Sequence, residues 1–126
     1  MPNSALPHHH EDDCIAQRLQ SFVNEVEHFS VVANIFKLMS DTSRIRVFWL
    51  LCHCEECVQN LSSLVNMSPP AVSHHLKQLK SSGLIVSRRN GKEVYYRAAD
   101  TAQTQLLHLM IEQTMEISCP DVSDTP

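Results

Sequence analysis

The side chains of this 126-residue chain that could most readily bind an ion or exchange electrons are its cysteines. They are Cys14, Cys52, Cys54, Cys57 and Cys119. The chain starts without the basic and apolar segments of a secretion signal, so we expect a cytoplasmic protein. Because cytoplasmic cysteines are kept reduced, we expect thiols or metal ligands rather than structural disulfides. An enzyme using Cys54 or Cys57 as nucleophile and His53 as base is not expected, since no oxyanion motif accompanies these residues.

A second group of side chains suits contact with nucleic acid. The formal net charge is −4, but residues 68–97 hold six basic residues against Glu93 alone, a local charge of +5. A local basic patch attracts phosphate whatever the total charge, so we expect a double-stranded DNA partner. The candidate contacts are Ser68, Ser73, His74, Lys77, Gln78, Arg88, Arg89 and Lys92. Gln78 could pair with an adenine edge, and the candidates after residue 87 would contact phosphate or a minor groove.

A helix must hold the first of these candidates in place. Ser68 suits its N-cap, Pro69 its first turn and Gly83 the position just after its end. The apolar seam of this helix is formed by Val72, Leu76 and Leu79. The polar candidates fall on the opposite half, while His75 lies nearer the seam and is expected to pack.

A β-hairpin must hold the remaining candidates. Residues 84–89 and 92–97 are rich in β-forming side chains, and Asn90-Gly91 separates them. This dipeptide predicts a two-residue type I′ turn, because both central residues of such a turn need a positive φ. The turn would place Arg89 opposite Lys92 and Arg88 opposite Glu93, which gives the hairpin a basic tip.

Helical spacing of apolar residues places the other elements. It predicts helices over residues 14–28 and 31–39, a third that Asp41 or Thr42 caps, a short one over 58–65 and a last one over 100–117. Residues 52–57 are expected to be a thiol-rich junction between two helices. We divide the chain into a mobile arm (residues 1–13), one domain (14–118) and a flexible tail (119–126).

These elements predict a mainly α fold with a small β-hairpin, namely a winged helix-turn-helix. The wide apolar surface of the last helix either forms a contact between two copies of the chain or closes the chain's own core. No apolar run approaches the roughly 20 residues that cross a membrane, so we expect no membrane partner. We also expect no organic cofactor.

From about Phe29 to Glu116, the chain resembles the ArsR/SmtB family of metal-responsive winged-helix repressors. The resemblance is carried by residues 39–46 (MSDTSRIR), 55–61 (EECVQNL), 70–79 (PAVSHHLKQL) and 89–97 (RNGKEVYYR). It implies a homodimer, joined through the first and last helices, that binds operator DNA near its own promoter and leaves when metal binds.

The resemblance also implies two places for an inducer. The family's site on the last helix falls on Asp100, Ala102, Gln113 and Glu116. Both of its histidines are missing here, so we expect no zinc site there. The family's cysteine site begins at Cys57, but Gln59 replaces its second cysteine.

Other thiols could complete the cysteine site. Cys14, Cys54 and Cys57, together with a histidine among His8, His9 and His10, would suit tetrahedral zinc, cadmium or lead. A second possibility is a trigonal arsenite site made by Cys52, Cys54 and Cys57. Their spacing matches an arsenic-binding motif of the family, but in the alignment it begins five residues upstream of that motif. Alternatively, these thiols could form a disulfide or persulfide bridge, which would make the input redox rather than metal.

Overall fold

The computed structural model describes residues 6–119 of the chain. The chain divides into an N-terminal unit that ends at Lys37 and a C-terminal unit that begins at Leu38. The first residues of the predicted arm and nearly all of the predicted tail, residues 1–5 and 120–126, lie outside the described part. Among the described residues, no helix is long and apolar enough to cross a membrane.

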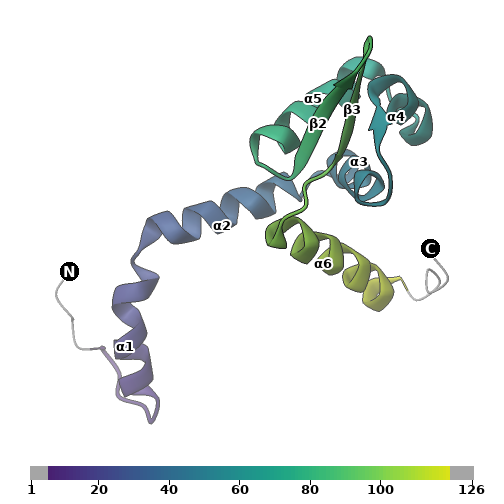
Figure 1. The fold of residues 1–126 in the computed structure, drawn as a ribbon. Helices are drawn as coiled ribbons and strands as arrows, with labels where there is room; N and C mark the ends of the chain where they lie inside the picture. Colours follow the sequence, from purple (N-terminus) through teal and green to yellow (C-terminus); the bar gives the residue numbers. More distant parts are fainter. Residues whose placement is uncertain (1–5, 120–126) are drawn as a thin grey trace. The chain divides into compact units, whose positions relative to one another are not determined.

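The N-terminal unit consists mainly of helices α1 (Asp13–Val23) and α2 (Val26–Leu38) (Figure 1). The break between them lies at Asn24 and Glu25, several residues before the predicted end of the first helix near His28. At this break the Asn24 side chain donates a hydrogen bond to the carbonyl of Gln20 at 2.8 Å. Neither helix buries any residue, so their apolar faces are uncovered in the single chain.

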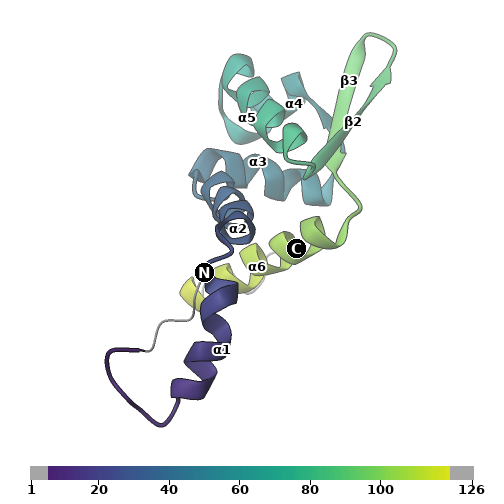
Figure 2. The same ribbon diagram turned by 90° about the vertical axis from the view of Figure 1, so that its left-hand side faces the viewer.

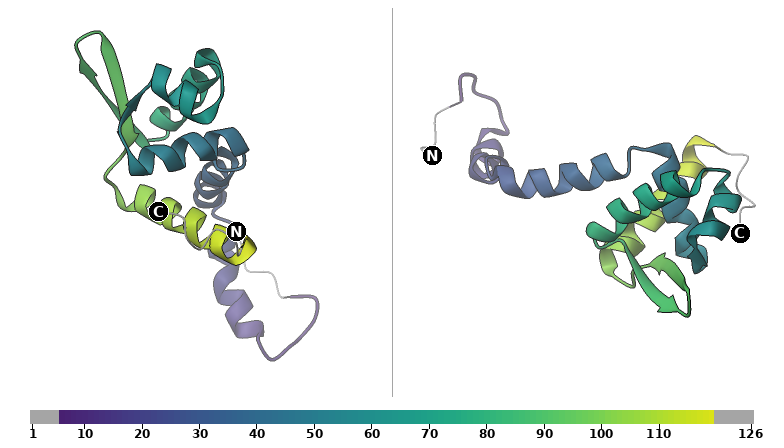
Figure 3. Two further views of the ribbon diagram at one scale, coloured as in Figure 1. Left: turned by 90° about the vertical axis from the view of Figure 1, so that its right-hand side faces the viewer. Right: turned by 90° about the horizontal axis from the view of Figure 1, so that it is seen from above.

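The C-terminal unit contains the predicted winged helix-turn-helix. Its elements are α3 (Thr42–His53), β1 (Glu56–Cys57), α4 (Val58–Val65), α5 (Pro69–Ser81), β2 (Ile85–Asn90), β3 (Glu93–Ala98) and α6 (Ala102–Ser118). Helix α3 lies between α6 on one side and α4 with α5 on the other (Figures 2 and 3). The core is closed by Val47, Phe48, Leu51, Leu61, Val72, Leu76, Leu79, Leu84 and Ile85.

Local hydrogen bonds start and stop these helices where the sequence predicts. The Asp41 carboxylate accepts from the N–H of Arg44 at 2.9 Å and caps α3. The Ser68 hydroxyl accepts from the N–H of Ala71 at 3.3 Å and caps α5. Gly83, with φ of +79°, ends α5 in a Schellman motif, because the Leu84 N–H reaches the Leu79 carbonyl at 3.1 Å.

The turn between α4 and α5 depends on a left-handed residue. Asn66 has φ of 56° and ψ of 52°, and its N–H bonds to the carbonyls of Ser62 and Ser63. Asparagine adopts this conformation at lower cost than most side chains, so it closes α4 within one residue. The N-cap of α5, Ser68, can then follow two residues later, as a tight helix-turn-helix requires.

The hairpin forms, but its turn lies one residue later than predicted, so the predicted partners of Arg88 and Arg89 on the opposite strand are wrong by two residues. Asn90 pairs with Glu93 and Arg89 with Val94, so the central turn residues are Gly91 and Lys92. Only Gly91, with φ of +66°, is left-handed, and one positive φ at the first central position is the pattern of a type II′ turn. Gly91 can adopt a positive φ in either turn, as the second central residue of the predicted turn or as the first of the observed one. The pairing of residues along both strands selects the observed register.

The sheet also has a strand that the sequence does not predict. Strand β1 pairs antiparallel with β3, with Glu56 opposite Tyr96 and Cys57 opposite Tyr95, which gives the strand order β1-β3-β2 in the described part. A two-residue strand has too few positions for an alternating pattern to be visible. Part of the predicted junction is therefore fixed to the base of the wing.

Candidate DNA-binding surface and thiol junction

One face of α5 presents the polar side chains predicted to read DNA. Ser73, His74 and Lys77 are exposed, whereas Val72, Leu76 and Leu79 on the other face are buried. Ser68 is exposed at the N-terminus of the same helix. Because backbone N–H groups and the positive end of the helix dipole lie there, this end favours phosphate. His75 is buried, with 8% of its surface exposed, and packs as predicted.

Gln78 has a different environment from its neighbours. It is half-buried, and its side-chain oxygen accepts a hydrogen bond from Arg44 Nη1 at 2.7 Å. Arg44 also donates from Nε to the carbonyl of Leu38 at 2.6 Å. In this conformation Gln78 braces α5 against the start of α3, so its oxygen is used inside the protein.

The wing carries its basic residues in two settings. Arg89 and Lys92 are exposed near the tip, which projects away from the helices (Figures 1 and 2). Arg88 instead makes a bidentate pair with Glu55, from Nε at 2.9 Å to Oε2 and from Nη2 at 2.7 Å to Oε1. Its guanidinium also lies 5.1 Å from the centre of the Tyr95 ring. The hydrogen bond from Arg88 lowers the pKa of Glu55, so this carboxylate stays charged at neutral pH.

The thiol junction lies where α3 ends and α4 begins. Cys54 is the extended residue after α3, and its Sγ donates to the carbonyl of Leu50 at 3.4 Å. Burial, and then the Glu56 carboxylate, raises the pKa of Cys54. Cys57 has 7% of its surface exposed and is the N-cap residue of α4. All five cysteines are free thiols.

Cys52 is the least reactive thiol of the junction. It is half-buried on the last turn of α3. Burial, and then the Glu112 carboxylate, raises the pKa of Cys52 to about 12. Because the thiolate is the nucleophile and the metal ligand, this side chain is held in its unreactive form at neutral pH.

The junction thiols do not gather into a three-sulfur cluster. Among the described residues, the one set of three potential ligand atoms lying within 4.8 Å of one another belongs to His53, His108 and Glu112. Cys14 is exposed on α1 in the N-terminal unit, and Cys119 is exposed just after α6. One chain therefore offers Cys54 and Cys57 on a single junction, and a four-coordinate thiol site there needs further donors.

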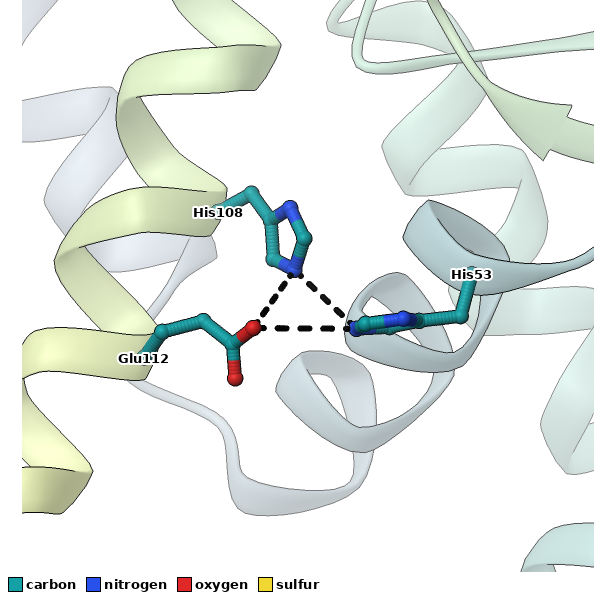
Figure 4. A group of neighbouring side chains, drawn as sticks. All are labelled: His53, His108 and Glu112. Carbon is teal, nitrogen blue, oxygen red and sulfur yellow. Dashed lines mark hydrogen bonds and ion pairs between the residues drawn. The ribbon is translucent and has the colours of Figure 1, made fainter. Parts of the chain in front are cut away.

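The cluster of His53, His108 and Glu112 was missed by the sequence interpretation (Figure 4). Its three side chains point toward one another, one from the end of α3 and two from α6. A signal existed in the spacing of His108 and Glu112, since residues four apart share one face of a helix. Neither residue is one of the positions that the family resemblance marks on the last helix.

Together these elements define a class of protein. A capped helix with an exposed polar face, a tight turn before it and a basic hairpin after it make a winged helix-turn-helix DNA-binding domain. The motifs resemble one family of such domains, and comparison with known proteins agrees. Residues 41–87 match the sequence model of the bacterial regulatory protein family arsR.

Individual relatives cover most of the chain. The arsenic resistance transcriptional regulator ArsR2 of Pseudomonas putida is 35% identical over 92 residues, which are 72% of this chain and 79% of that protein. The cadmium resistance transcriptional regulatory protein CadC of Listeria innocua is 32% identical over 87 residues, 68% of this chain and 73% of that one. The chain belongs to the ArsR/SmtB family of winged-helix transcriptional regulators.

Solved structures of other proteins share the fold. A homodimeric winged helix-turn-helix DNA-binding domain from Mycobacterium bovis, a possible ArsR-family transcriptional regulator solved by NMR, matches with a TM-score of 0.65. The match is 26% identical in sequence and covers 74% of this chain and 85% of that one. Both the sequence and the arrangement of its elements thus place this chain among transcriptional regulators rather than enzymes.

Proposed function

We propose that this protein is a cytoplasmic, homodimeric repressor that leaves its operator when a thiophilic metal or metalloid binds at its cysteines. The proposed inducers are cadmium, zinc, lead and arsenite, and the proposed ligands are Cys54 and Cys57 with Cys14 of a second copy of the chain. The domain spanning residues 14–118 would carry both the DNA contacts and the ligands.

The observation that carries the proposal is the position of Glu55. This residue lies between Cys54 and Cys57 in the chain, and its carboxylate holds Arg88 of the wing. A change in the backbone between the two thiols would therefore move the carboxylate that holds a basic wing residue. Cys57 also starts α4, the first helix of the helix-turn-helix. The thiol junction is thus directly connected to both parts of the DNA-binding surface.

The donor chemistry fits a thiophilic ion. Free thiols are soft ligands, and the N-terminus of α4 beside Cys57 favours negative charge. Apart from Cys52, whose pKa is raised, one chain provides two such donors at the junction, so a four-coordinate site requires donors from elsewhere. Cys14 and the histidines at residues 8–10 are the candidates, and the arsenic and cadmium resistance regulators among the relatives support a metal or metalloid input.

On DNA, each part of the surface has a proposed role. Ser73, His74 and Lys77 would face base edges in the major groove, since the exposed face of α5 carries them. Ser68, Arg89 and Lys92 would contact phosphates, which sets the position of the protein without reading sequence. Gln78 would act mainly by bracing α5, and Arg88 would reach phosphate when Glu55 releases it.

Release follows from coupling between the two sites. The recognition helices of a dimer must enter major grooves about 34 Å apart. An ion bound by both Cys54 and Cys57 would hold the junction, α4 and Arg88 in one fixed arrangement. In that arrangement the recognition helices of the dimer would no longer match this spacing. A coupling free energy of about 3 kcal/mol weakens DNA binding roughly 150-fold, and DNA weakens metal binding by the same factor.

The experiment is a metal titration of the protein bound to fluorescent DNA from upstream of its own gene. Cadmium, zinc, lead and arsenite are added in turn to the unmodified protein and to Cys14→Ser, Cys54→Ser and Cys57→Ser. We expect Cys57→Ser to need at least about tenfold more metal for release, whereas the exposed-thiol control Cys119→Ser behaves like the unmodified protein. Release of Cys57→Ser at the unchanged metal concentration would show that the proposed site is wrong.

The same titration separates metal from redox input. A metal-dependent repressor regains DNA binding when a strong chelator is added. A repressor that responds through a disulfide or persulfide ignores the chelator and regains DNA binding only with a reductant. The second outcome would replace the proposed inducer while leaving the DNA-binding surface unchanged.

A further inference from the structure

We propose that His53, His108 and Glu112 bind a divalent transition-metal ion of the zinc, cobalt and nickel class, at a site separate from the cysteines. This inference does not rest on the proposed function, because it concerns binding of an ion and not release of DNA. It rests on three ligand atoms that converge from two helices of the same unit (Figure 4).

The distances among the three ligand atoms match a tetrahedral ion. His53 Nε2 and His108 Nε2 are 3.1 Å apart. Glu112 Oε1 lies 3.3 Å from His108 Nε2 and 3.8 Å from His53 Nε2. Bonds of about 2.0–2.1 Å from zinc to nitrogen or oxygen require ligand atoms about 3.3–3.4 Å apart in a tetrahedron. An ion therefore fits between these atoms with shifts of a few tenths of an ångström.

The site is anchored on regular structure and open to solvent. His108 and Glu112 are four residues apart on α6, and His53 is the last residue of α3. Their side chains are 27%, 33% and 33% exposed, respectively. An ion can therefore enter without unfolding, and water can take the fourth position. Two imidazoles and one carboxylate form a borderline donor set, which favours zinc, cobalt or nickel over magnesium or calcium.

Trp49 supports the orientation of two of the ligands. Its indole Nε1–H donates to Glu112 Oε2 at 3.2 Å, so the other carboxylate oxygen remains directed at the histidines. Its ring centroid lies 4.3 Å from that of His53. Such outer partners restrict the rotamers of metal ligands and strengthen binding. The cluster thus has three donors and a supporting side chain.

A network without metal is the competing explanation. A shared hydrogen bond between the two histidines, with Glu112 beside protonated imidazole, would also hold these atoms together. Such a network links α3 to α6 but has no reason to bind an ion one-to-one or to tell cobalt from magnesium. Ion binding is therefore the property that decides between the two explanations.

Trp49 is the chain's single tryptophan and provides the readout. Cobalt is titrated into a full-length Cys14→Ser, Cys54→Ser, Cys57→Ser variant while tryptophan fluorescence is recorded. Because paramagnetic cobalt quenches a nearby indole, we expect saturable quenching at one ion per chain. Added zinc should reverse it, and magnesium should have no effect. The cobalt spectrum should show ligand-field bands without sulfur-to-metal charge transfer.

Matched variants identify the ligands. In the same background, His108→Ala and the milder Glu112→Gln should each weaken cobalt binding at least about 100-fold, more than the roughly 10–100-fold that loss of an outer partner costs. His28→Gln, which also removes a histidine paired with a carboxylate, should bind cobalt unchanged. Circular dichroism checks that each variant is folded.

Three results would overturn the proposal. The first is the absence of quenching in the variant that lacks the three proposed thiol ligands. The second is equal cobalt affinity in His28→Gln, His108→Ala and Glu112→Gln. The third is quenching that survives His108→Ala but disappears when residues 8–10 are changed to glutamine, since the ion would then be bound by the arm. These outcomes leave the DNA-release proposal unaffected, because the cysteine experiment measures it separately.

Discussion

At the scale of single residues, neighbouring histidines differ because of their surroundings. His74 is exposed on the DNA-facing side of α5, whereas His75 is buried and its Nδ1 has no hydrogen-bond partner among the described residues. Burial lowers the pKa of His75, and Arg44 and His74 lower it further, while Asp41 acts in the opposite direction. Folding therefore favours the neutral form of this imidazole.

This environment predicts a pH dependence of stability. The unfolded chain binds a proton at His75 near pH 6.5, but the folded chain binds it only at lower pH. The contribution of His75 to the free energy of unfolding is therefore fully present above about pH 6.5 and is lost as the pH drops below it, by at most about 1.4 kcal/mol per pH unit for one proton. His75→Leu should lose this part of the dependence, as measured by urea unfolding at pH 7.5 and 5.5.

The control is His74→Leu, which removes the exposed neighbour. It should keep most of the pH dependence of the unmodified protein, because burial, the largest cause of the lowered pKa of His75, is unchanged. If the stability curves of His75→Leu and the unmodified protein ran parallel between the two pH values, the buried histidine would not be the titrating group.

At the scale of elements, the wing and the thiol junction form one connected structure. Strand β1 pairs with β3, and the Glu55–Arg88 pair crosses from the junction to β2. The exposed setting of Arg88 means that this ion pair contributes little to stability. Its larger consequence is that it occupies a guanidinium that could otherwise contact phosphate.

This arrangement predicts that Glu55→Gln tightens DNA binding in the absence of metal. Freeing Arg88 should raise the affinity roughly three- to tenfold at low salt, about 0.6–1.4 kcal/mol. One added phosphate contact should also make the slope of log affinity against log salt more negative by about one. Fluorescence anisotropy over a salt series measures both quantities.

Glu93→Gln is the matched control, because it removes the same charge from the hairpin itself, next to the turn, where Glu93 lies opposite Asn90. It should alter affinity less than Glu55→Gln and leave the salt slope closer to that of the unmodified protein. Equal effects of the two changes would mean that only overall charge matters and that Arg88 is not withheld by Glu55.

At the scale of the whole molecule, uncovered apolar surface supports the proposed dimer. Helix α6 exposes Leu106, Leu109, Met110 and Ile117, and Leu106 has 57% of its surface exposed. Helices α1 and α2 expose further large apolar side chains. Such surfaces mark contacts with other proteins, and the M. bovis domain of the same fold is homodimeric.

We therefore expect Leu106→Glu to shift the protein from dimer to monomer in sedimentation experiments, because burying an unpaired charge at the contact is costly. Its operator affinity should fall at least about 100-fold, since linking two half-site readers contributes about 10²–10⁴. Gln113→Glu adds the same charge to an exposed polar position of α6 and should remain dimeric. If Leu106→Glu remained dimeric, the contact between the two copies would not lie at this part of α6.

The sequence by itself determined the features that depend on neighbours along the chain. Asp41, Ser68 and Gly83 start or end helices through groups three to five residues away, so their roles could be predicted without the fold. The polar face of α5 and the presence of a hairpin followed from periodicity and turn chemistry. The family followed from motifs that combine these same local features.

The tertiary structure decided what depends on residues far apart in the chain. The hairpin frame, strand β1 and the Gln78–Arg44 brace each depend on which elements pack together. The same holds for the His53–His108 contact, which joins residues 55 positions apart. Spacing along the chain specifies which side chains share a helix face, but only packing brings two such faces within coordination distance.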